Sequence, residues 1–583
     1  MLLTKLGLGE VRRGGVLTLE NQSRTQPERE KIDGRAPRRA QRRTADIPPG
    51  RGEHPKGHGQ GKDAKRTSQR RHAAGYLALQ GGVRPAASLS IACLAALAVT
   101  VAVTWPLALH LSEVAPRSTF TGGHVAALSI ATHVPPWSTH TDLAGWPGGA
   151  DFRPLLWPTI ALAHLVGALT AYNLTILLVP SLNLLGGWAL GRVLFAENRA
   201  ALLLGALIAF PPWVRTTLQN GQPEQAILGL AAAILALSVW SVQGTRWRML
   251  LVAPAVALAG ISAPHVVLAG LGVLGVWALA GVRTERRRLV VLALAGVGAG
   301  AVARYHAPGF DGSITHFFAP FGLLDATAGP TPKRAARLVD LFFEARLPPG
   351  RGPWVVHLAY IGPPLAVAAA LGAARSRWAV VAGLVLVVAA FGDAGPFRWI
   401  SGLSSTIAAS GTPYRFIAGA VLAFSIAAAR TRWAPLVVAF SLVESALVDP
   451  RPLPFALAKM PQDAPAISDV RGAVLDLPLV SRGCREAAAH YLAEAGRNGR
   501  ASPLLLRSGV GAWGADPSRL AALEGAFSAP DCAARLPPLL NDFAVVTAHD
   551  HGDCRLPKAH IACLTQVLGV GTTVGETTFW AIP

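Results

Sequence analysis

The sequence predicts a mainly α-helical membrane protein: a polytopic bundle of about eleven transmembrane helices, followed by a small C-terminal extracytoplasmic α/β domain. Two observations predict this class. Hydrophobic residues make up 51% of the 583 residues and charged residues only 15%, whereas in soluble domains roughly a quarter of all residues are charged. Long stretches such as Ser88–Leu111 and Ala226–Val242 are almost free of charge, which a water-exposed surface does not sustain.

The apolar stretches define the expected spans. Crossing the hydrocarbon core takes about 20 apolar residues in a helix, so the shorter stretches must extend into flanking polar residues. The expected spans are Ser88–Leu111, Tyr172–Leu194, Ala200–Trp213, Ala226–Val242, Met249–Ala263, His265–Val282, Leu289–Ala303, Trp354–Ala373, Trp378–Phe391, Phe416–Ala429 and Trp433–Leu447.

The positive charges predict the orientation. Cytoplasmic turns carry an excess of Lys and Arg, and every second turn here is basic, whereas Thr216–Gln225 and Ser262–His265 are not. The alternation requires that Pro154–Leu169 lies along the outer interface without crossing. An odd number of crossings then places the N-terminus in the cytoplasm and the C-terminal domain outside. The basic turns carry Arg192, Arg199, Arg246, Arg248, Arg283, Arg286–Arg288, Arg375, Arg377, Arg430 and Arg432.

The chain divides into three expected parts. Residues 1–84 hold 19 Lys and Arg against 8 Asp and Glu and few apolar residues, which predicts a disordered basic tail. We interpret its charge as solvated and topogenic and expect no nucleic-acid partner; binding to anionic lipid or RNA, or a start codon assigned too early, are the alternatives. Residues 85–448 form the transmembrane domain, with long outer loops at 112–169 and 305–353. Residues 449–583 form the extracytoplasmic domain.

The C-terminal part alternates strand and helix patterns. Short apolar runs predict buried strands at Gly472–Val480 and Phe543–Ala548 and a terminal strand at Thr577–Ile582. Helices are expected at Arg519–Phe527 and Ala533–Leu540. The result is a modest α/β domain.

Four of the five cysteines fall in this domain: Cys484, Cys532, Cys554 and Cys563. An even number of cysteines in an oxidising compartment favours two disulfides, and the sequence leaves all three pairings open. Cys554 with Cys563 closes the shortest loop. The competing interpretations are free thiols or a metal site, because His549, His551, Cys554, His560 and Cys563 crowd into fifteen residues. Their spacing matches no common zinc module.

The first outer loop is the candidate site of chemistry. It combines glycines, aromatic residues, three histidines (His124, His133, His140) and two aspartates (Asp142, Asp151). An ordinary loop packed on the membrane is the alternative to an active-site rim. The sequence lacks a P-loop and a dinucleotide fingerprint, which argues against ATP-driven transport. Few ionisable residues lie inside the expected spans, which argues against an ion pathway.

The order of several motifs from about residue 95 onward resembles polytopic bacterial membrane proteins of the GT-C glycosyltransferase type. In those proteins a first span and a Gly-Gly turn precede a long outer loop. The motifs that carry the resemblance are Thr104-Trp-Pro-Leu107, Gly122-Gly123, Trp146-Pro-Gly-Gly-Ala-Asp-Phe152, Ala171-Tyr-Asn-Leu174, Gly221-Gln-Pro-Glu-Gln225, Gly411-Thr-Pro-Tyr-Arg-Phe416 and Val474-Leu-Asp-Leu-Pro-Leu479.

The resemblance implies transfer of a sugar from a polyprenyl-phosphate carrier to an envelope glycan acceptor on the outer face of a bacterial inner membrane. Asp151 or Asp142 would act as base or help to hold a divalent metal ion, with His124 as polar partner. Arg415 matches an arginine common in the family and would grip the lipid phosphate, because a guanidinium binds phosphate through two parallel hydrogen bonds. Snorkelling at the interface is the alternative for Arg415.

One position departs from the family pattern. His124 stands where the family usually carries an aspartate after the Gly-Gly turn. This departure leaves a second hypothesis open, a non-catalytic scaffold of the same fold that binds a lipid or a partner protein. A transporter or flippase is a third hypothesis, disfavoured by the scarcity of polar groups in the spans.

Overall fold

The structure is a computed structural model of the whole chain, and it divides into two compact units, 1–75 and 76–583. All residues described below belong to the second unit. They are residues 85–116, 121, 125, 128, 139–140, 148–149, 157–195, 197–243, 246–280, 284–305, 341, 360–391, 413–447, 455–459, 474–477, 517–541, 543–549, 556–574 and 577–582.

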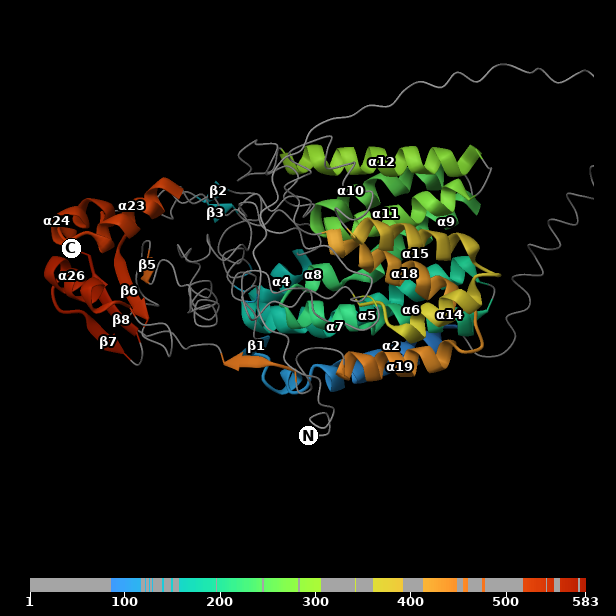
Figure 1. The fold of residues 1–583 in the computed structure, drawn as a ribbon, viewed down its shortest axis with the longest axis horizontal. Coiled ribbons are helices and arrows are strands. Elements are labelled where there is room, and N and C mark those ends of the chain that lie inside the picture. The colour runs from blue at the N-terminus through green and yellow to red at the C-terminus, as the bar shows by residue number, and fades with distance from the viewer. Residues whose placement is uncertain are drawn as a thin grey trace, which may run out of the picture. The chain divides into compact units, whose positions relative to one another are not determined.

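The larger part of the described chain is a bundle of helices packed side by side (Figure 1). Its elements in chain order are α2 (Pro85–Val103), η1 (Leu107–Leu109), α4 (Trp157–Val166), α5 (Ala168–Leu194), α6 (Asn198–Ala209), α7 (Pro212–Gln219), α8 (Pro223–Ala226), α9 (Leu228–Gln243), η3 (Arg246–Leu251), α10 (Val252–Ser262), α11 (Pro264–Leu279), α12 (Thr284–Tyr305), α14 (Pro363–Gly372), α15 (Arg377–Ala390), η6 (Pro413–Phe416), α18 (Ile417–Ala428) and α19 (Ala434–Leu447).

Proline and glycine set several helix boundaries. Pro212, Pro223 and Pro264 each stand at the first turn of a helix, where the missing N–H costs no hydrogen bond. The predicted span Ala200–Trp213 lies within the helical segment Asn198–Gln219, in which α6 ends at Ala209 and Pro212 begins α7. Met249, where the span Met249–Ala263 was expected to start, belongs to the 3-10 helix η3, which directly precedes α10.

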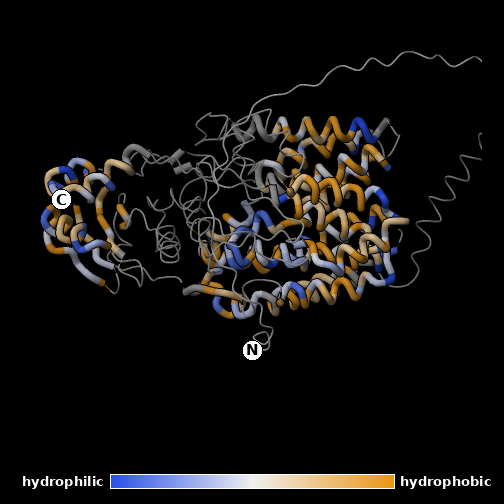
Figure 2. The backbone as a smooth tube through the Cα atoms, in the orientation of Figure 1, coloured by the Kyte–Doolittle hydropathy of each residue, from blue (hydrophilic) through white to orange (hydrophobic). Residues whose placement is uncertain are grey.

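The outer surface of the bundle is apolar. Leu279 is 84% exposed and Leu165 is 81% exposed, and many other large side chains on these helices are also exposed. Figure 2 shows hydrophobic residues through the middle of the bundle and hydrophilic residues towards its two ends. Exposed apolar surface of this extent suits the hydrocarbon interior of a bilayer. Further exposed examples are Ile91, Leu94, Leu178, Leu182, Leu258, Leu294, Val367, Leu371, Leu384, Val385, Phe440 and Val443.

Helix length alone supports only part of the expected topology. By length and composition, two described segments can cross a bilayer, Ala168–Leu194 and Asn198–Gln219, and the other apolar helices among the described residues are shorter. The mainly helical class with a small C-terminal sheet is confirmed. The number of crossings stays a prediction.

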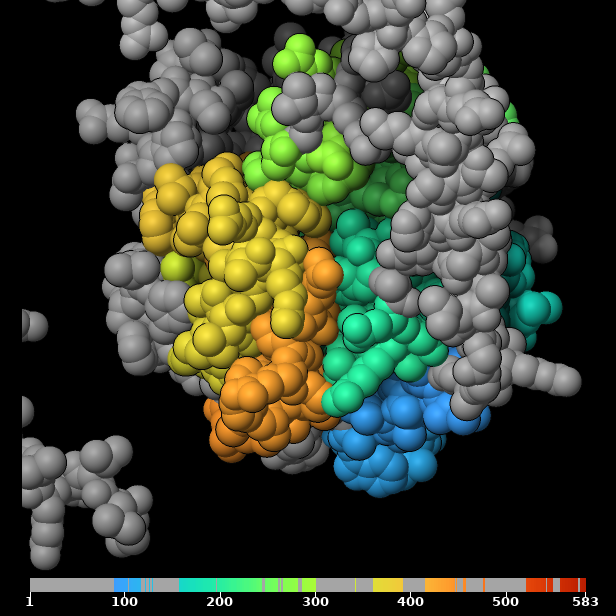
Figure 3. All heavy atoms as spheres, turned by 90° about the vertical axis from the view of Figure 1, so that its right-hand side faces the viewer, coloured from blue at the N-terminus to red at the C-terminus, as the bar shows by residue number. Residues whose placement is uncertain are grey.

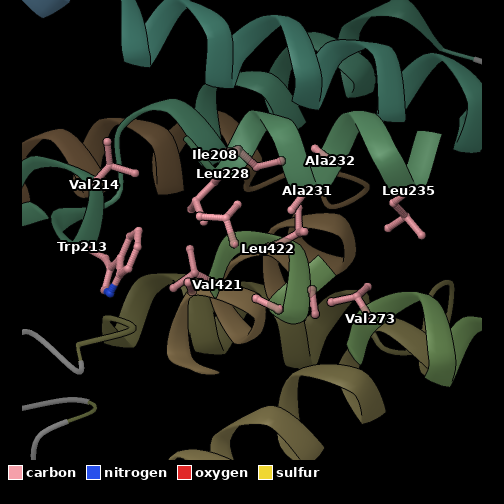
Figure 4. Packing of buried hydrophobic residues seen from close by; sticks show 14 of the residues in the cluster. Ile208, Trp213, Val214, Leu228, Ala231, Ala232, Leu235, Val273, Val421 and Leu422 are labelled. Atoms are coloured by element: carbon pink, nitrogen blue, oxygen red, sulfur yellow. The ribbon is translucent and has the colours of Figure 1, made fainter. Parts of the chain in front are cut away.

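The interior of the bundle is a continuous apolar core. Figure 4 shows Ile208 of α6, Leu228 and Leu235 of α9, Val273 of α11 and Leu422 of α18 converging on one another. Most of these side chains are fully buried. In a bilayer, moving such side chains from lipid into the core changes their transfer free energy little, because lipid tails are equally apolar. Close van der Waals packing between the helices therefore contributes most of the stability of the bundle.

Small residues bring α5 close to two neighbours. A Cβ on Gly186 would overlap the backbone of Gly229 in α9, and a Cβ on Gly187 would lie 2.8 Å from Cα of Gly205 in α6. These close backbone approaches are the small-residue packing that membrane helices favour. α5 therefore packs closely against both α6 and α9.

A buried asparagine stabilises the junction between α8 and α9. Asn183 lies in the interior of α5 with no exposed surface. Its Nδ2 donates to the Ala226 carbonyl at 2.9 Å, and its Oδ1 accepts from the Gly229 N–H at 2.8 Å. Both backbone groups lie at the junction and would otherwise lack partners in an apolar setting, which is costly.

The C-terminal domain contains a four-stranded sheet with the order β5-β6-β8-β7. β5 (Val474–Leu477) pairs with β6 (Val545–His549) in parallel, and the remaining pairs are antiparallel. α23 (Pro517–Ser528), α24 (Cys532–Arg535), α25 (Pro537–Leu540) and α26 (Lys558–Leu568) contribute buried residues to the same core as the sheet, which ends with β7 (Thr572–Val574) and β8 (Thr577–Ala581).

The strands expected at 472–480, 543–548 and 577–582 are present, each a little shorter or shifted. The helix expected at Ala533–Leu540 is divided into two because Pro537 cannot continue the turn before it. The sequence analysis missed α26 and β7. The apolar residues Ile561, Leu564 and Leu568 carry a helical period, but the neighbouring cysteines and histidines were interpreted as ligands or disulfide partners.

A disulfide joins Cys532 of α24 to Cys563 of α26, with 6.1 Å between their Cα atoms. It is one of the pairings left open by the sequence. Cys484 and Cys554 lie outside the described residues, and Cys93 is a free cysteine of α2.

If two disulfides form, Cys484 must pair with Cys554. Peptide mapping of the non-reduced, membrane-extracted protein is expected to find the 532–563 and the 484–554 cross-links. The same digest after reduction serves as control. A link between Cys554 and Cys563 would contradict the pairing.

Replacing Gly186 by alanine is expected to destabilise the bundle by about 1–3 kcal/mol, because the added methyl group must displace the backbone of α9. Gly275→Ala is the matched control: a Cβ there meets nothing within 4 Å, so the substitution leaves stability unchanged or raises it by up to ~1 kcal/mol. Thermal unfolding of the detergent-solubilised variants measures both. Equal midpoints for the two variants would contradict the close α5–α9 packing.

Candidate functional site

A short buried polar segment lies between α6 and α9. Pro211 and Pro212 end α6, and α7 and α8 follow as two brief helices joined by a turn at Gly221. The sequence analysis took Thr216–Gln225 as an outer turn without further structure. Most polar side chains here are instead nearly inaccessible to solvent: Arg215, Thr216, Thr217, Gln219, Asn220 and Gln222 are each less than 10% exposed.

The centre of this segment is a hydrogen-bonded contact between three distant parts of the chain. The Tyr172 hydroxyl donates to the Gly221 carbonyl at 2.9 Å and lies 3.4 Å from the Thr121 hydroxyl. Thr121 donates in turn to the Pro116 carbonyl at 2.8 Å. Gly221 has a φ of +74°, a conformation that favours glycine, and a Cβ there would overlap the Thr121 hydroxyl.

The next residue of α5 holds the start of the first outer loop. Asn173 is fully buried, and its Nδ2 donates to the carbonyls of Leu111 and Val114 at 2.8 and 2.7 Å. Val114 begins β1 (Val114–Pro116). Tyr172 and Asn173 therefore fix both β1 and the residue Thr121 that follows it.

The chain after α19 returns to the same place. β4 (Leu457–Lys459) pairs antiparallel with β1, and the Phe455 N–H donates to the Trp105 carbonyl at 2.8 Å. Gln219 at the end of α7 makes two hydrogen bonds with the backbone of Ala456, at 2.8 and 3.2 Å. We call Thr121, Tyr172, Asn173, Gln219 and Gly221 the loop junction.

Two further polar contacts lie near the end of α19. Arg215 of α7 donates to the Ser445 carbonyl at 2.9 Å, and the Ser445 hydroxyl donates to the Phe210 carbonyl at 2.9 Å. Beside them, the Tyr360 hydroxyl donates to Glu444 at 3.0 Å. A carboxyl group in an apolar helix is costly without such a partner.

Arg415 is described and half-buried. It lies in η6 at the start of α18, and η6 packs against α11 and α15. The short helix α8 also packs against α11. Glu224 of α8 is half-buried, and its carboxylate is close enough to the Tyr172 hydroxyl to interact with it electrostatically. Arg415 in η6 and Glu224 in α8 thus belong to two segments that pack against the same helix, α11.

The other predicted site residues, His124, Asp142 and Asp151, lie outside the described residues, so their roles remain predictions. Two pieces of the same loop are described: β2 (Thr139–His140) pairs antiparallel with β3 (Gly148–Gly149). In the sequence, Asp142 follows β2 by two residues and Asp151 follows β3 by two.

No cluster of three or more His, Cys, Asp or Glu side chains that could hold a metal ion is found among the described residues. In the C-terminal domain, Cys563 shares a disulfide with Cys532 and cannot act as a thiolate ligand in that state. His560 packs against the Phe527 ring with 5.2 Å between centroids, and burial lowers the pKa of its imidazole. His551 and Cys554 lie outside the described residues, and a divalent metal in the first loop stays a prediction.

No family model matches the sequence, and no curated protein matches it. The structure is similar to that of ArnT from Cupriavidus metallidurans bound to undecaprenyl phosphate, at 14% identity and a TM-score of 0.44, over 84% of this chain and 97% of that chain. It is also similar to the oligosaccharyltransferase of Archaeoglobus fulgidus tethered with an acceptor peptide, at 11% identity and a TM-score of 0.39, over 80% of this chain and 69% of that chain. Both likenesses are distant.

The sequence analysis named neither Glu224 nor Glu444 as a candidate site residue. The motif Gly221–Gln225 carries a usable signal, since Gly, Pro and Glu together predict a tight polar turn where an apolar span begins. Nothing in the sequence predicts the Tyr360–Glu444 contact, because its partners are far apart along the chain.

The loop junction makes one prediction for Gly221. Gly221→Ala is expected to loosen the first outer loop, because the added methyl group displaces Thr121 and Tyr172. Gly167→Ala is the matched control, since Gly167 also has a positive φ of +84° but a Cβ there meets nothing within 4 Å. Both variants carry the same backbone strain, of order 1–3 kcal/mol.

Hydrogen exchange of peptides covering residues 111–121 and 455–459 measures the effect. Faster exchange of both peptides in Gly221→Ala alone supports the junction. Equal exchange in the two variants would show that Gly221 acts through backbone strain only.

Proposed function

We propose that this protein is a GT-C-type membrane glycosyltransferase that transfers a sugar from a polyprenyl-phosphate carrier to an envelope glycan acceptor on the extracytoplasmic face. The single observation that carries the proposal is the convergence of the resemblance motifs. Residues of three motifs meet through the contacts of the loop junction and the returning β4 segment. They are Trp105 of Thr104–Leu107, Tyr172 and Asn173 of Ala171–Leu174, and Gly221 of Gly221–Gln225.

The arrangement supports the roles expected from the resemblance. A polar end of an apolar bundle is a suitable place for a lipid whose phosphate lies at the interface and whose chain lies in the bilayer. In this proposal Arg415, which is half-buried in η6, grips that phosphate through two hydrogen bonds. Undecaprenyl phosphate, present in the similar ArnT structure, is the first carrier to test.

The catalytic carboxylate is expected on the same end. The acceptor hydroxyl must lose a proton as its oxygen bonds to the anomeric carbon and the carrier phosphate leaves. Asp151 and Asp142 remain the candidates of the first loop. Glu224 joins them because it follows the Gly221 turn, and the Tyr172 hydroxyl links that turn to Thr121, which precedes the Gly-Gly turn in the sequence. A carboxylate in this role contributes roughly 10²–10⁴ in rate.

The same end also fits the proposed orientation. The turns at the opposite end carry the arginines, so the positive-inside rule places the loop junction and the C-terminal domain outside. An oxidising compartment agrees with the disulfide between Cys532 and Cys563.

Complementation of a deletion strain tests the function. Wild type is expected to restore the envelope glycan, and Asp151→Asn and Glu224→Gln separate the candidate bases, the true base losing at least about 100-fold in transfer. Arg415→Lys keeps the charge but loses the planar fork, so transfer is expected to fall about tenfold. Mass spectrometry of envelope glycans measures all variants after equal membrane expression is confirmed.

Two conservative changes at the opposite end serve as controls. Glu197→Gln and Arg377→Lys alter exposed residues of the same types and are expected to behave as wild type. If Asp142→Asn, Asp151→Asn, Glu224→Gln and Arg415→Lys all restore the glycan fully, the scaffold hypothesis replaces catalysis. An unchanged glycan in the deletion strain would remove the proposed function altogether.

A further inference from the structure

The end of the bundle opposite the loop junction is a surface of arginines and aromatic rings. It is made by the turns α5–α6, α9–α10, α11–α12, α14–α15 and α18–α19. Described arginines of these turns are Arg192, Arg199, Arg246, Arg248, Arg286–Arg288, Arg375, Arg377, Arg430 and Arg432. We call this the arginine face. Among the described side chains of this face, none forms an ion pair with another described residue.

Contacts between the turns make this one continuous surface. Arg375 and Arg430 each donate to the other's carbonyl, at 3.0 and 3.2 Å. The Arg430 guanidinium lies 5.6 Å from the Phe195 ring centroid. Gln243 at the end of α9 donates to the Val193 carbonyl at 3.4 Å. Figure 3 views the bundle from this end and shows the yellow, orange and green helices packed side by side.

Three arginines of this face are held against tryptophan. One is Arg432, whose guanidinium lies 4.9 Å from the Trp433 ring, and the other two are Arg248 and Arg286. The Arg248 guanidinium lies 4.1 Å from the Trp240 ring and 6.0 Å from the Trp247 ring. The Arg286 guanidinium lies 4.4 Å from the Trp277 ring, and one of its nitrogens donates to the Trp277 carbonyl at 3.3 Å. Stacking fixes the plane of each guanidinium. Among the described residues, the Nε atoms of Arg248 and Arg286 have no hydrogen-bond partner.

These two arginines lie in adjoining elements. Arg248 is in η3 and Arg286 is in the first turn of α12, and η3 packs against α9, α10 and α12. Arg287 and Arg288 beside them are exposed. The positive charge is therefore concentrated where η3 meets α12.

The same 3-10 turn carries exposed apolar side chains. Trp247 is 58% exposed, Leu250 is 66% exposed, and Leu251 is also exposed. A soluble anion such as a nucleic acid offers no match for them. A membrane phospholipid does, because its phosphate and its acyl chains lie side by side at the interface where tryptophan is favoured.

We propose that η3 and the start of α12 form a binding site for the phosphate of an anionic phospholipid in the leaflet that contacts the arginine face. Arg248 and Arg286 present stacked guanidiniums to the phosphate oxygens, and Trp247 and Leu250 lie along the acyl chains. Arg287 and Arg288 attract the negative headgroup over a longer range. The site is separate from the candidate glycosyltransferase site and does not depend on its activity.

Native mass spectrometry of the full-length, detergent-solubilised protein tests the site with added phosphatidylglycerol or phosphatidylcholine. Wild type is expected to bind phosphatidylglycerol at least tenfold more tightly than phosphatidylcholine. The double variant Arg248→Gln/Arg286→Gln is expected to lose about tenfold of the phosphatidylglycerol affinity. Inorganic phosphate at millimolar concentration is expected not to compete, since it lacks the acyl chains.

Arg199→Gln/Arg377→Gln is the matched control, because it removes the same charge from exposed arginines of the same face for which no stacking on a described ring is found. Its affinity is expected to stay within about threefold of wild type. Equal losses in the two double variants would replace the site by diffuse attraction, and no loss in either would exclude it. If Arg248→Gln/Arg286→Gln fails to fold, the exposed variant Trp247→Ala provides the test, with a loss of phosphatidylglycerol preference expected and an unchanged preference contradicting the site.

Discussion

The organisation of the polar end depends on one set of buried hydrogen bonds, those around the Gly221 turn. An apolar bundle offers few partners for polar groups, so each buried donor and acceptor there must be paired by another part of the chain. Tyr172 and Asn173 pair them with the first loop, and Gln219 pairs them with the segment after α19. Removing one partner leaves another buried group unsatisfied, which costs more than the bond itself contributes. The contacts are therefore mutually dependent.

The two ends of the bundle use polar residues in different ways. At the loop junction, neutral side chains are buried and form hydrogen bonds with one another and with backbone carbonyls. At the arginine face, cations remain at the surface, and their plane is fixed by aromatic rings or by helix-end carbonyls. The first arrangement holds loops in one position, whereas the second presents charge to whatever lies beyond the helix ends. Between them, Gly186 and Gly229 allow the helices to approach closely enough to form a dense apolar core.

Much of this fold follows from the sequence, because long apolar stretches and basic turns act locally. The helices, the basic end and the strands near 474, 545 and 577 follow from such patterns. The buried α7 does not: its polar sequence indicates a surface turn, and the partners that permit its burial, Ser445 and Ala456, are distant in the chain. The same holds for the pairing of Cys532 with Cys563. For the candidate site, the motifs indicated Arg415 and the Gly221 turn, but only the fold shows that η6, which carries Arg415, and α8, which follows Gly221, pack against the same helix α11.

The pairing of β1 with β4 has a consequence for how the chain is made. Residues 114–116 leave the ribosome early, and residues 457–459 leave it only after every helix of the bundle. During most of synthesis, the β1 strand of the first loop therefore lacks the hydrogen-bond partners that β4 later supplies. The last hydrogen bonds that hold it form only when the chain beyond α19 has been synthesised. A protein truncated at the end of the bundle thus retains its helices but lacks the strand that completes its outer loop. The β1–β4 pairing therefore forms only in a chain that has been synthesised past residue 459.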